Sequence, residues 1–183
     1  MSKENADKEQ KRSFKREVFS WIACIVVTIL LTEFILNFVI INANIPSGSM
    51  ENTIMTTDKL IALRTSYWFN DPKRGDIIIF KYPDDETEWF IKRVIALPGE
   101  TVLVKDGKVY INGSKKALSE PYIKEEPVED FGPYKVPKNG YFVMGDNRNN
   151  SNDAREWETH YVSRDEVLGK AWFRYYPSIK VIK

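Results

Sequence analysis

The chain is poor in the side chains that bind metals or form disulfides. Its 183 residues include one cysteine, Cys24, and one histidine, His160. A single cysteine cannot build a disulfide framework or a thiolate cluster, and a single histidine does not supply a His-rich ligand set. The sequence therefore predicts a protein without a metal ion or another cofactor.

The chain also lacks a net charge of either sign. Its 27 basic and 26 acidic residues leave a formal charge of +1. Proteins that bind nucleic acid need a positive field to neutralise phosphates, and no such field is available here. We therefore expect no nucleic-acid partner, and any function of the basic residues must be local.

What the chain does have is one long apolar run, from Val18 to Ile41. Its length exceeds the roughly 20 residues that a helix needs to cross a bilayer. The preceding residues are too polar to fold alone, and their excess of Lys and Arg predicts a cytoplasmic N-terminus. We predict a cytoplasmic polar tail over 1–17, a transmembrane helix over 18–41 and an extracytoplasmic β-rich domain over 42–183.

A cleaved secretory signal peptide is the competing interpretation of this run. The apolar region of a signal peptide is usually shorter and ends in an Ala-x-Ala-like site, whereas Asn42-Ala43-Asn44 follows here. We therefore expect an uncleaved anchor in the cell membrane. Glu33 and Asn37 interrupt the run four residues apart on one helical face, and the sequence does not indicate their role.

Past residue 45 the sequence is typical of antiparallel β-structure. No segment has a long 3.6-residue apolar period, and short β-branched or aromatic runs alternate with turn residues. Asp106-Gly107 favours a type I′ hairpin turn between two of these runs. Residues 114–138, rich in Lys, Glu and Pro, indicate an irregular solvated excursion. The predicted strands cover 75–83, 89–96, 102–104, 109–111, 140–144 and 169–176.

A turn of small residues, Ile45 to Met50, follows the apolar run. A hydroxyl on a tight turn can project into a cleft while nearby backbone N–H groups stay free to hold an oxyanion, so Ser49 is a candidate nucleophile. A linker between anchor and domain is the alternative, because turn residues also cluster for purely structural reasons.

A serine nucleophile needs a proton acceptor, and the sequence offers Lys92 or His160. Lys92 lies in an apolar strand, where burial would lower its pKa into the range of a general base. Strand alternation allows the opposite interpretation, in which Lys92 points to solvent.

The polar block from Gly145 to Arg155 follows an apolar strand. Counted from Asp146 as a calcium loop, it has Arg148 at a ligand position and Trp157 where the bidentate glutamate belongs, so the calcium interpretation fails. A surface loop of turn formers and an acid–base network that supports an active site both remain open.

Trp68 and Phe69 lie in a polar loop. They suit either the core or the bilayer interface, where aromatic residues of anchored proteins collect.

Taken in order along the chain, these motifs closely resemble type I signal peptidases. The resemblance rests on the apolar span, Pro46-Ser47-Gly48-Ser49-Met50, Arg74-Gly75-Asp76, Lys92-Arg93, Leu97-Pro98-Gly99-Glu100 and the block from Gly145 to Arg155. It covers nearly the whole chain, and the combination is specific although each motif alone is weak. Two departures affect local loop geometry: Asn52 replaces the family's proline, and residues 156–162 lack the usual glycine and look two residues longer.

The resemblance implies a Ser-Lys dyad, with Ser49 as nucleophile and Lys92 as general base. It also implies that Ser47 and the N–H of Ser49 form the oxyanion hole and that Ser151 orients the lysine amine by a hydrogen bond. The implied supporting residues are Asp146, Arg93, Asp153 and Arg155.

The implied substrates are secreted precursors with signal peptides, whose cleavage region would add as a strand beside Ile45, Phe90 and Ile91. Shallow apolar pockets there would admit only small residues, the Ala-x-Ala pattern. The expected partners are these precursors and membrane lipid, and we expect a monomer.

Two rivals remain at the level of sequence. A self-cleaving Ser-Lys repressor-type protease is disfavoured by the membrane anchor. An inert, membrane-tethered β scaffold gives no reason for Ser49, Lys92 and the 145–155 block to occur together.

Overall fold

The computed structural model describes the backbone of residues 3–182 and the side chains of residue 12 and residues 14–182. It separates into two compact units, with the boundary between Val39 and Ile40. The second unit contains the described strands and all the candidate site residues, from Ile45 to Arg155.

The first unit is helical. Helix α1 spans Lys3–Phe34 and continues into a π-helical turn, Ile35–Val39. Residues Phe14–Val39 are long and apolar enough to cross a membrane. In the π-helical turn, the Asn37 side chain donates hydrogen bonds to the backbone oxygen and the carboxylate of Glu33, at 2.9 and 3.1 Å.

The helical boundaries differ from the predicted ones at both ends. Residues 3–17, predicted as a tail, belong to α1, because adding a residue to an existing helix is much easier than starting one. Ile40 and Ile41, predicted as the end of the span, instead begin the first strand.

The second unit is built on a large antiparallel sheet with strand order β1-β2-β10-β3-β4-β8-β9, to which β11 adds at β10. Two 3₁₀ turns, η2 (Arg64–Tyr67) and η3 (Arg164–Glu166), connect its strands. The strand bounds are Ile40–Asn44 (β1), Lys59–Leu63 (β2), Ile77–Tyr82 (β3), Asp85–Ala96 (β4), Gly140–Met144 (β8), Val162–Ser163 (β9), Val167–Tyr176 (β10) and Lys180–Val181 (β11).

The sequence of strand β3 is a continuous apolar run because the strand has a buried core on each face. Ile78 and Phe80 belong to one buried core, whereas Ile77 and Ile79 belong to another. Because successive side chains of a strand point to opposite faces, a strand with a core on each face needs apolar residues at every position.

A second, three-stranded sheet has the order β6-β5-β7. It comprises Thr101–Lys105 (β5), Lys108–Ile111 (β6) and Phe131–Lys135 (β7). The β5–β6 turn has positive φ at both Asp106 and Gly107, +49° and +75°, as the predicted type I′ turn requires. The excursion over 114–138 is less irregular than predicted, because it contains β7, which pairs with β5.

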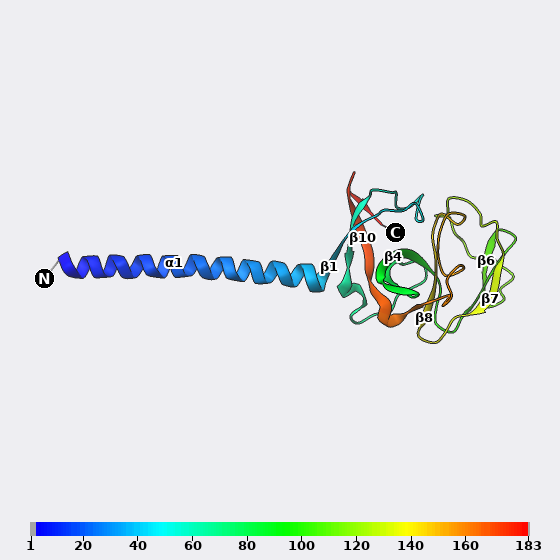
Figure 1. Cartoon of the computed structure of the whole chain (residues 1–183), viewed down its shortest axis with the longest axis horizontal. Helices are drawn as coiled ribbons and strands as arrows, with labels where there is room; N and C mark the ends of the chain where they lie inside the picture. The colour runs from blue at the N-terminus through cyan, green and yellow to red at the C-terminus, as the bar shows by residue number, and fades with distance from the viewer. Residues whose placement is uncertain (1–2, 183) are drawn as a thin grey trace. The chain divides into compact units, whose positions relative to one another are not determined.

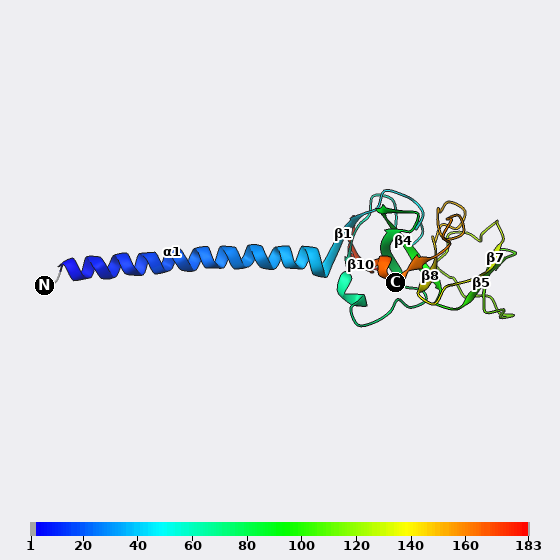
Figure 2. The same ribbon diagram turned by 60° about the horizontal axis from the view of Figure 1, so that its bottom comes forward.

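In both views of the chain, β8 lies between β4 and the small sheet (Figures 1 and 2). Apolar residues of both sheets, such as Val104 and Phe142, share one core. The predicted fold class, a mainly antiparallel β domain with an N-terminal apolar helix, is therefore confirmed.

Candidate active site

The small-residue turn after β1 is fixed by backbone hydrogen bonds rather than left as a loose linker. Ile45 donates to the carbonyl of Asp58, and Thr57 donates back to the carbonyl of Ile45. Asn147 holds the other end, since its backbone N–H donates to Ser49 O and its side chain to Gly48 O. Ser49 is therefore held in a buried position, with 6% of its surface exposed.

Lys92, on β4, is the partner of Ser49. Its Nζ lies 2.8 Å from Ser49 Oγ. The lysine is only 4% exposed, so the interpretation in which it points to solvent is wrong. No carboxylate in the described chain lies within ion-pair distance of this amine.

Burial lowers the pKa of Lys92 from 10.5 to about 8, because a charged amine loses its hydration inside the protein. The negative charge of Asp153 opposes this shift but is the smaller effect. The neutral fraction of Lys92 near pH 7 is therefore small but far larger than that of an ordinary lysine, and the neutral amine has a lone pair that can accept a proton.

Two hydrogen-bond donors lie beside the Ser49 hydroxyl: the backbone N–H of Ser49 and the hydroxyl of Ser47. The backbone N–H of Ser49 donates no hydrogen bond within the described residues. Ser47 Oγ lies 3.4 Å from Ser49 Oγ, close enough for its hydroxyl to reach an oxygen bound at the same carbon. The two groups match the arrangement that stabilises a tetrahedral intermediate.

Ser151 does not make the predicted hydrogen bond to Lys92. Its Oγ is buried and has no hydrogen-bond partner in the described part of the chain. The hydroxyl instead packs against Gly145, where a Cβ would collide with both Ser151 Oγ and the carbonyl oxygen of Ser49. Glycine at 145 thus lets the polar block approach the serine turn, while the amine of Lys92 is directed at Ser49.

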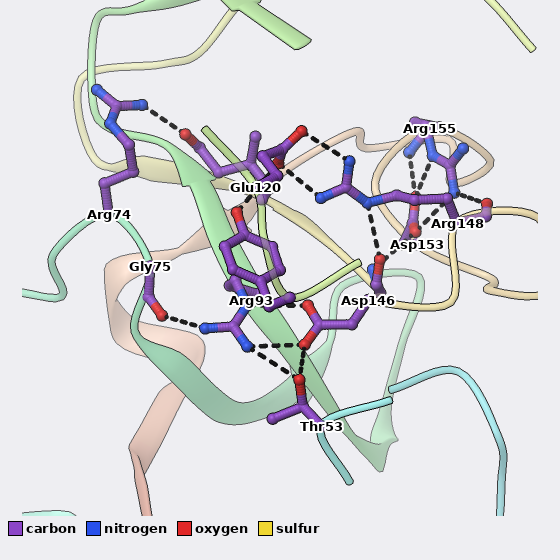
Figure 3. Close-up of polar contacts among 12 residues, drawn as sticks. Thr53, Arg74, Gly75, Arg93, Glu120, Asp146, Arg148, Asp153 and Arg155 are labelled. Carbon is purple, nitrogen blue, oxygen red and sulfur yellow. Dashed lines mark hydrogen bonds and ion pairs between the residues drawn. The ribbon is translucent and has the colours of Figure 1, made fainter. Parts of the chain in front are cut away.

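The neighbouring residue on β4, Arg93, forms a buried ion pair with Asp146 (Figure 3). Its Nε and one terminal nitrogen donate to the two carboxylate oxygens at 2.8 and 2.7 Å. The other terminal nitrogen donates to Gly75 O at 2.8 Å, and Thr53 donates to Asp146 at 2.5 Å. The guanidinium also lies over the ring of Tyr122. Arg93 and Asp146, each expected to be a supporting residue, thus join β4 to the end of β8.

The other two expected supporting residues, Asp153 and Arg155, form an ion pair with each other. Arg155 Nε lies 2.9 Å from Asp153 Oδ1, and Asp153 in turn accepts the N–H of Gly145. Arg148, whose Nε donates to Gly145 O, forms a two-bond ion pair with Glu120 from the excursion. The charged side chains of the 145–155 block therefore form a largely buried network, whereas Asn149, Asn150 and Asn152 are exposed.

A groove leads to the reactive pair. A cavity of about 590 Å³ has Ser49 and Lys92 in its lining, together with Ile45, Phe90 and Ile91. These are the three residues predicted to bind substrate. Strand β1 pairs only with β2, and the residues of β4 before Arg93 have no partner on the β8 side, so both strands present free edges to this region within the described sheet.

His160 is not oriented as a base for Ser49. Its Nδ1 is 2.8 Å from the carbonyl oxygen of Ala154, and its ring packs edge-on against Phe131 and Tyr134. The ring therefore belongs to the packing between the small sheet and the polar block.

The two departures from the family pattern have visible structural consequences. Asn52 has φ of +87°, which the fixed φ of proline near −65° cannot reach, and its side chain donates to Tyr122 O. In the longer segment, Trp157 is buried and packs against the rings of Tyr82 and Phe90. The extra residues thus add core behind the groove.

Sequence reasoning gave no role to Asn147, Thr53 or Tyr122. Each contacts a group on a distant segment: Asn147 the serine turn, Thr53 the Asp146 carboxylate and Tyr122 the Arg93 guanidinium. No spacing rule in the sequence pairs such positions.

Comparison with known proteins identifies the family of this chain. The family model "Signal peptidase, peptidase S26" matches residues 18–176. A probable signal peptidase I-2 from Synechocystis is 43% identical over 161 residues, covering 85% of this chain and 72% of that protein. A signal peptidase I from Bacillus amyloliquefaciens is 34% identical over 185 residues, covering 96% and 97%.

A crystal structure of a signal peptidase I from Enterococcus faecalis is also similar. It is 36% identical, with a TM-score of 0.48 over 55% of this chain and 97% of that one. The family match and the curated relatives, which are named signal peptidase I, leave one assignment: the chain belongs to the signal peptidase family, peptidase S26.

Proposed function

We propose that this protein is a membrane-anchored serine endopeptidase that removes N-terminal signal peptides from secreted precursors by a Ser49–Lys92 dyad. One observation carries the proposal. A buried lysine amine with no carboxylate partner among the described residues lies 2.8 Å from the hydroxyl of a buried serine on a tight turn. A protein has little structural reason to bury an unpaired amine, so the arrangement favours a chemical role.

In the first half of the reaction, neutral Lys92 takes the proton of Ser49 while the serine oxygen attacks the carbonyl carbon of the scissile peptide bond. The negative charge moves to the carbonyl oxygen, where the Ser49 N–H and the Ser47 hydroxyl can donate to it. Lys92 then gives its proton to the leaving amine, and the C–N bond breaks. One amine thus serves as base and then acid.

In the second half, water replaces the mature protein. Lys92, neutral again, takes a proton from a water molecule that attacks the acyl-enzyme carbonyl. Collapse of the second tetrahedral intermediate breaks the ester bond, and Lys92 returns the proton to Ser49. The buried ion pairs Arg93–Asp146 and Arg155–Asp153 support this geometry by holding β4 and the polar block in place.

The substrate's cleavage region would bind as an added strand between the free edges of β1 and β4. Backbone hydrogen bonds would set its register, and alternate side chains would point into the groove. Walls made by Ile45, Phe90 and Ile91 leave room for small side chains, which supports cleavage after Ala-x-Ala.

For the topology, we propose a cytoplasmic tail, a single span and an extracytoplasmic catalytic domain, acting as a monomer on precursors at the lipid surface. Basic residues before the span support this orientation. Protease added to spheroplasts should cut loops only after the span, and protection of those loops would contradict the proposed orientation.

The direct test is incubation of the detergent-solubilised full chain with a precursor that carries an Ala-x-Ala site. We expect cleavage after the second alanine by the wild type and none by Ser49→Ala. Replacing that alanine by phenylalanine should abolish cleavage, because a packed wall rejects excess volume. Cleavage by Ser49→Ala as fast as by the wild type would refute the dyad, whereas no cleavage by either protein would favour the inert scaffold.

A further inference from the structure

Three cavities lie in series along the proposed path of the substrate. The first, about 230 Å³, is walled by β1 and β4 and shares Ile45 and Phe90 with the cavity of about 590 Å³ that holds Ser49 and Lys92. That middle cavity shares Asn150 and Asn152 with a third, of about 780 Å³. A chain that enters by the first cavity and reacts in the second must leave beside the third.

Hydrogen bonds between distant segments hold one wall of the third cavity in place. One of its walls is formed by Val128 and Glu129 of the excursion. The side chain of Asn149 holds this part of the excursion by two hydrogen bonds. Asn149 Nδ2 donates to Glu126 O at 3.0 Å, and Asn149 Oδ1 accepts the N–H of Val128 at 2.9 Å. Ser151 also lines this cavity, and its buried hydroxyl has no partner within the described residues.

The charges around the third cavity do not cancel. Its two arginines are already paired, Arg148 with Glu120 and Arg155 with Asp153. Its two exposed carboxylates, Glu129 and Glu156, make no side-chain hydrogen bond or ion pair in the described part of the chain. The cavity therefore has a negative potential from two free carboxylates.

We propose that this cavity binds the first residues of the mature protein, directly after the cut, and that Glu129 and Glu156 favour basic over acidic residues there. The inference rests on the proposed function, because it takes Ser49 as the point of cleavage. It gives the excursion a role: Asn149 holds it where it forms the far wall of the exit side. The apolar first cavity and the polar third cavity would thus select opposite kinds of side chain.

The test uses three peptides with the same residues before the cut and Lys, Gln or Glu at the second and third positions after it. For the full chain in a nonionic detergent, kcat/KM should fall in the order Lys, Gln, Glu. Exposed charge pairs are weak, so we expect about three- to tenfold between the Lys and Glu peptides, shrinking at high salt. The double variant Glu129→Gln/Glu156→Gln should lose most of this ratio.

A matched control removes the same charge elsewhere. Glu125 and Asp165 are exposed acids outside the cavity, so Glu125→Gln/Asp165→Asn should keep the wild-type ratio. Equal loss of the ratio in both double variants would assign it to overall charge and overturn the proposed site. Equal rates for all three peptides in the wild type would also overturn it.

A binding measurement separates this inference from the proposed function. Fluorescence anisotropy of the same labelled peptides on Ser49→Ala should give the same order of affinity, Lys over Gln over Glu, without any cleavage. If the wild type leaves all three peptides intact, the proposed function fails, whereas the charge order on Ser49→Ala still decides the exit site. No charge order in binding would refute the site even if cleavage proceeds.

Discussion

Strand β4 carries a buried basic side chain on each face, Arg93 on one and Lys92 on the other, and the surroundings of the two differ. Arg93 is 2% exposed and its guanidinium is matched by Asp146, Gly75 and Tyr122. Lys92, the preceding residue, is 4% exposed, and its amine contacts the Ser49 hydroxyl and the face of the Phe90 ring but no carboxylate of the described residues. The arginine therefore stays charged as part of the framework, whereas the lysine is pushed towards its neutral form.

The difference separates a supporting charge from a reactive one. A lowering of the Lys92 pKa from 10.5 to about 8 corresponds to about 3 kcal/mol against the charged form. A paired buried cation instead becomes costly only when its partner is removed. Each prediction below tests this contrast.

The largest expected effect is a loss of catalytic activity when Ser49 or Lys92 is replaced. Ser49→Ala and Lys92→Arg should each lower kcat by about a thousandfold or more, because arginine stays protonated and cannot act as a base. The double variant should be hardly worse than either single one, since the two groups act as a unit. His160→Ala should keep most of the activity; a folded but inactive His160→Ala beside an active Lys92→Arg would revive a serine–histidine mechanism.

Removing the cation on the Arg93 face of β4 should instead lower the stability of the protein. Arg93→Met leaves Asp146 buried without its cation and should cost about 3–5 kcal/mol of unfolding free energy. Lys92→Met removes an unpaired amine and should leave stability unchanged or increase it by about 1–3 kcal/mol, while activity is lost. Thermal or urea unfolding of the full chain in detergent measures both, and an equal loss for the two variants would remove the contrast.

The pH dependence of activity and of stability should reflect the lowered pKa of Lys92. Below about pH 8, kcat/KM should rise about tenfold per pH unit and then level off as the amine becomes neutral. Between about pH 8 and 10.5 the unfolded chain binds more protons at this residue than the native chain. Wild-type stability should therefore rise with pH relative to Lys92→Met in this window. A rate profile without an inflection near pH 8 would contradict Lys92 as the base.

The smallest effect is expected at the exposed aromatic pair. Trp68 is 52% and Phe69 91% exposed, which argues against a core role and favours the bilayer interface. Changing both to serine should lower cleavage of membrane-embedded precursors a few-fold more than cleavage of short soluble peptides. Equal losses on both substrates would assign the pair to protein stability instead.

Much of this molecule was determined by local patterns in the sequence. The apolar run is long enough for a helix that could cross a bilayer, and the Asp106-Gly107 dipeptide produced the type I′ turn because both residues tolerate positive φ. Short apolar runs produced the strands of the large sheet. The order of several weak motifs along the chain also identified Ser49 and Lys92 as candidate site residues, although neither motif was sufficient alone.

Other features were decided only by tertiary structure, because they depend on segments that are distant in the chain. The direction of Lys92 followed from strand pairing: β4 had to lie beside the serine turn before burial could lower the lysine pKa. Ser151 makes no hydrogen bond to Lys92 because its hydroxyl packs against Gly145, close to the carbonyl oxygen of Ser49. Strand β7 formed because it could pair with the edge of β5. A sequence pattern reports periodicity within a segment, whereas the distance between two segments is set by packing of the whole domain.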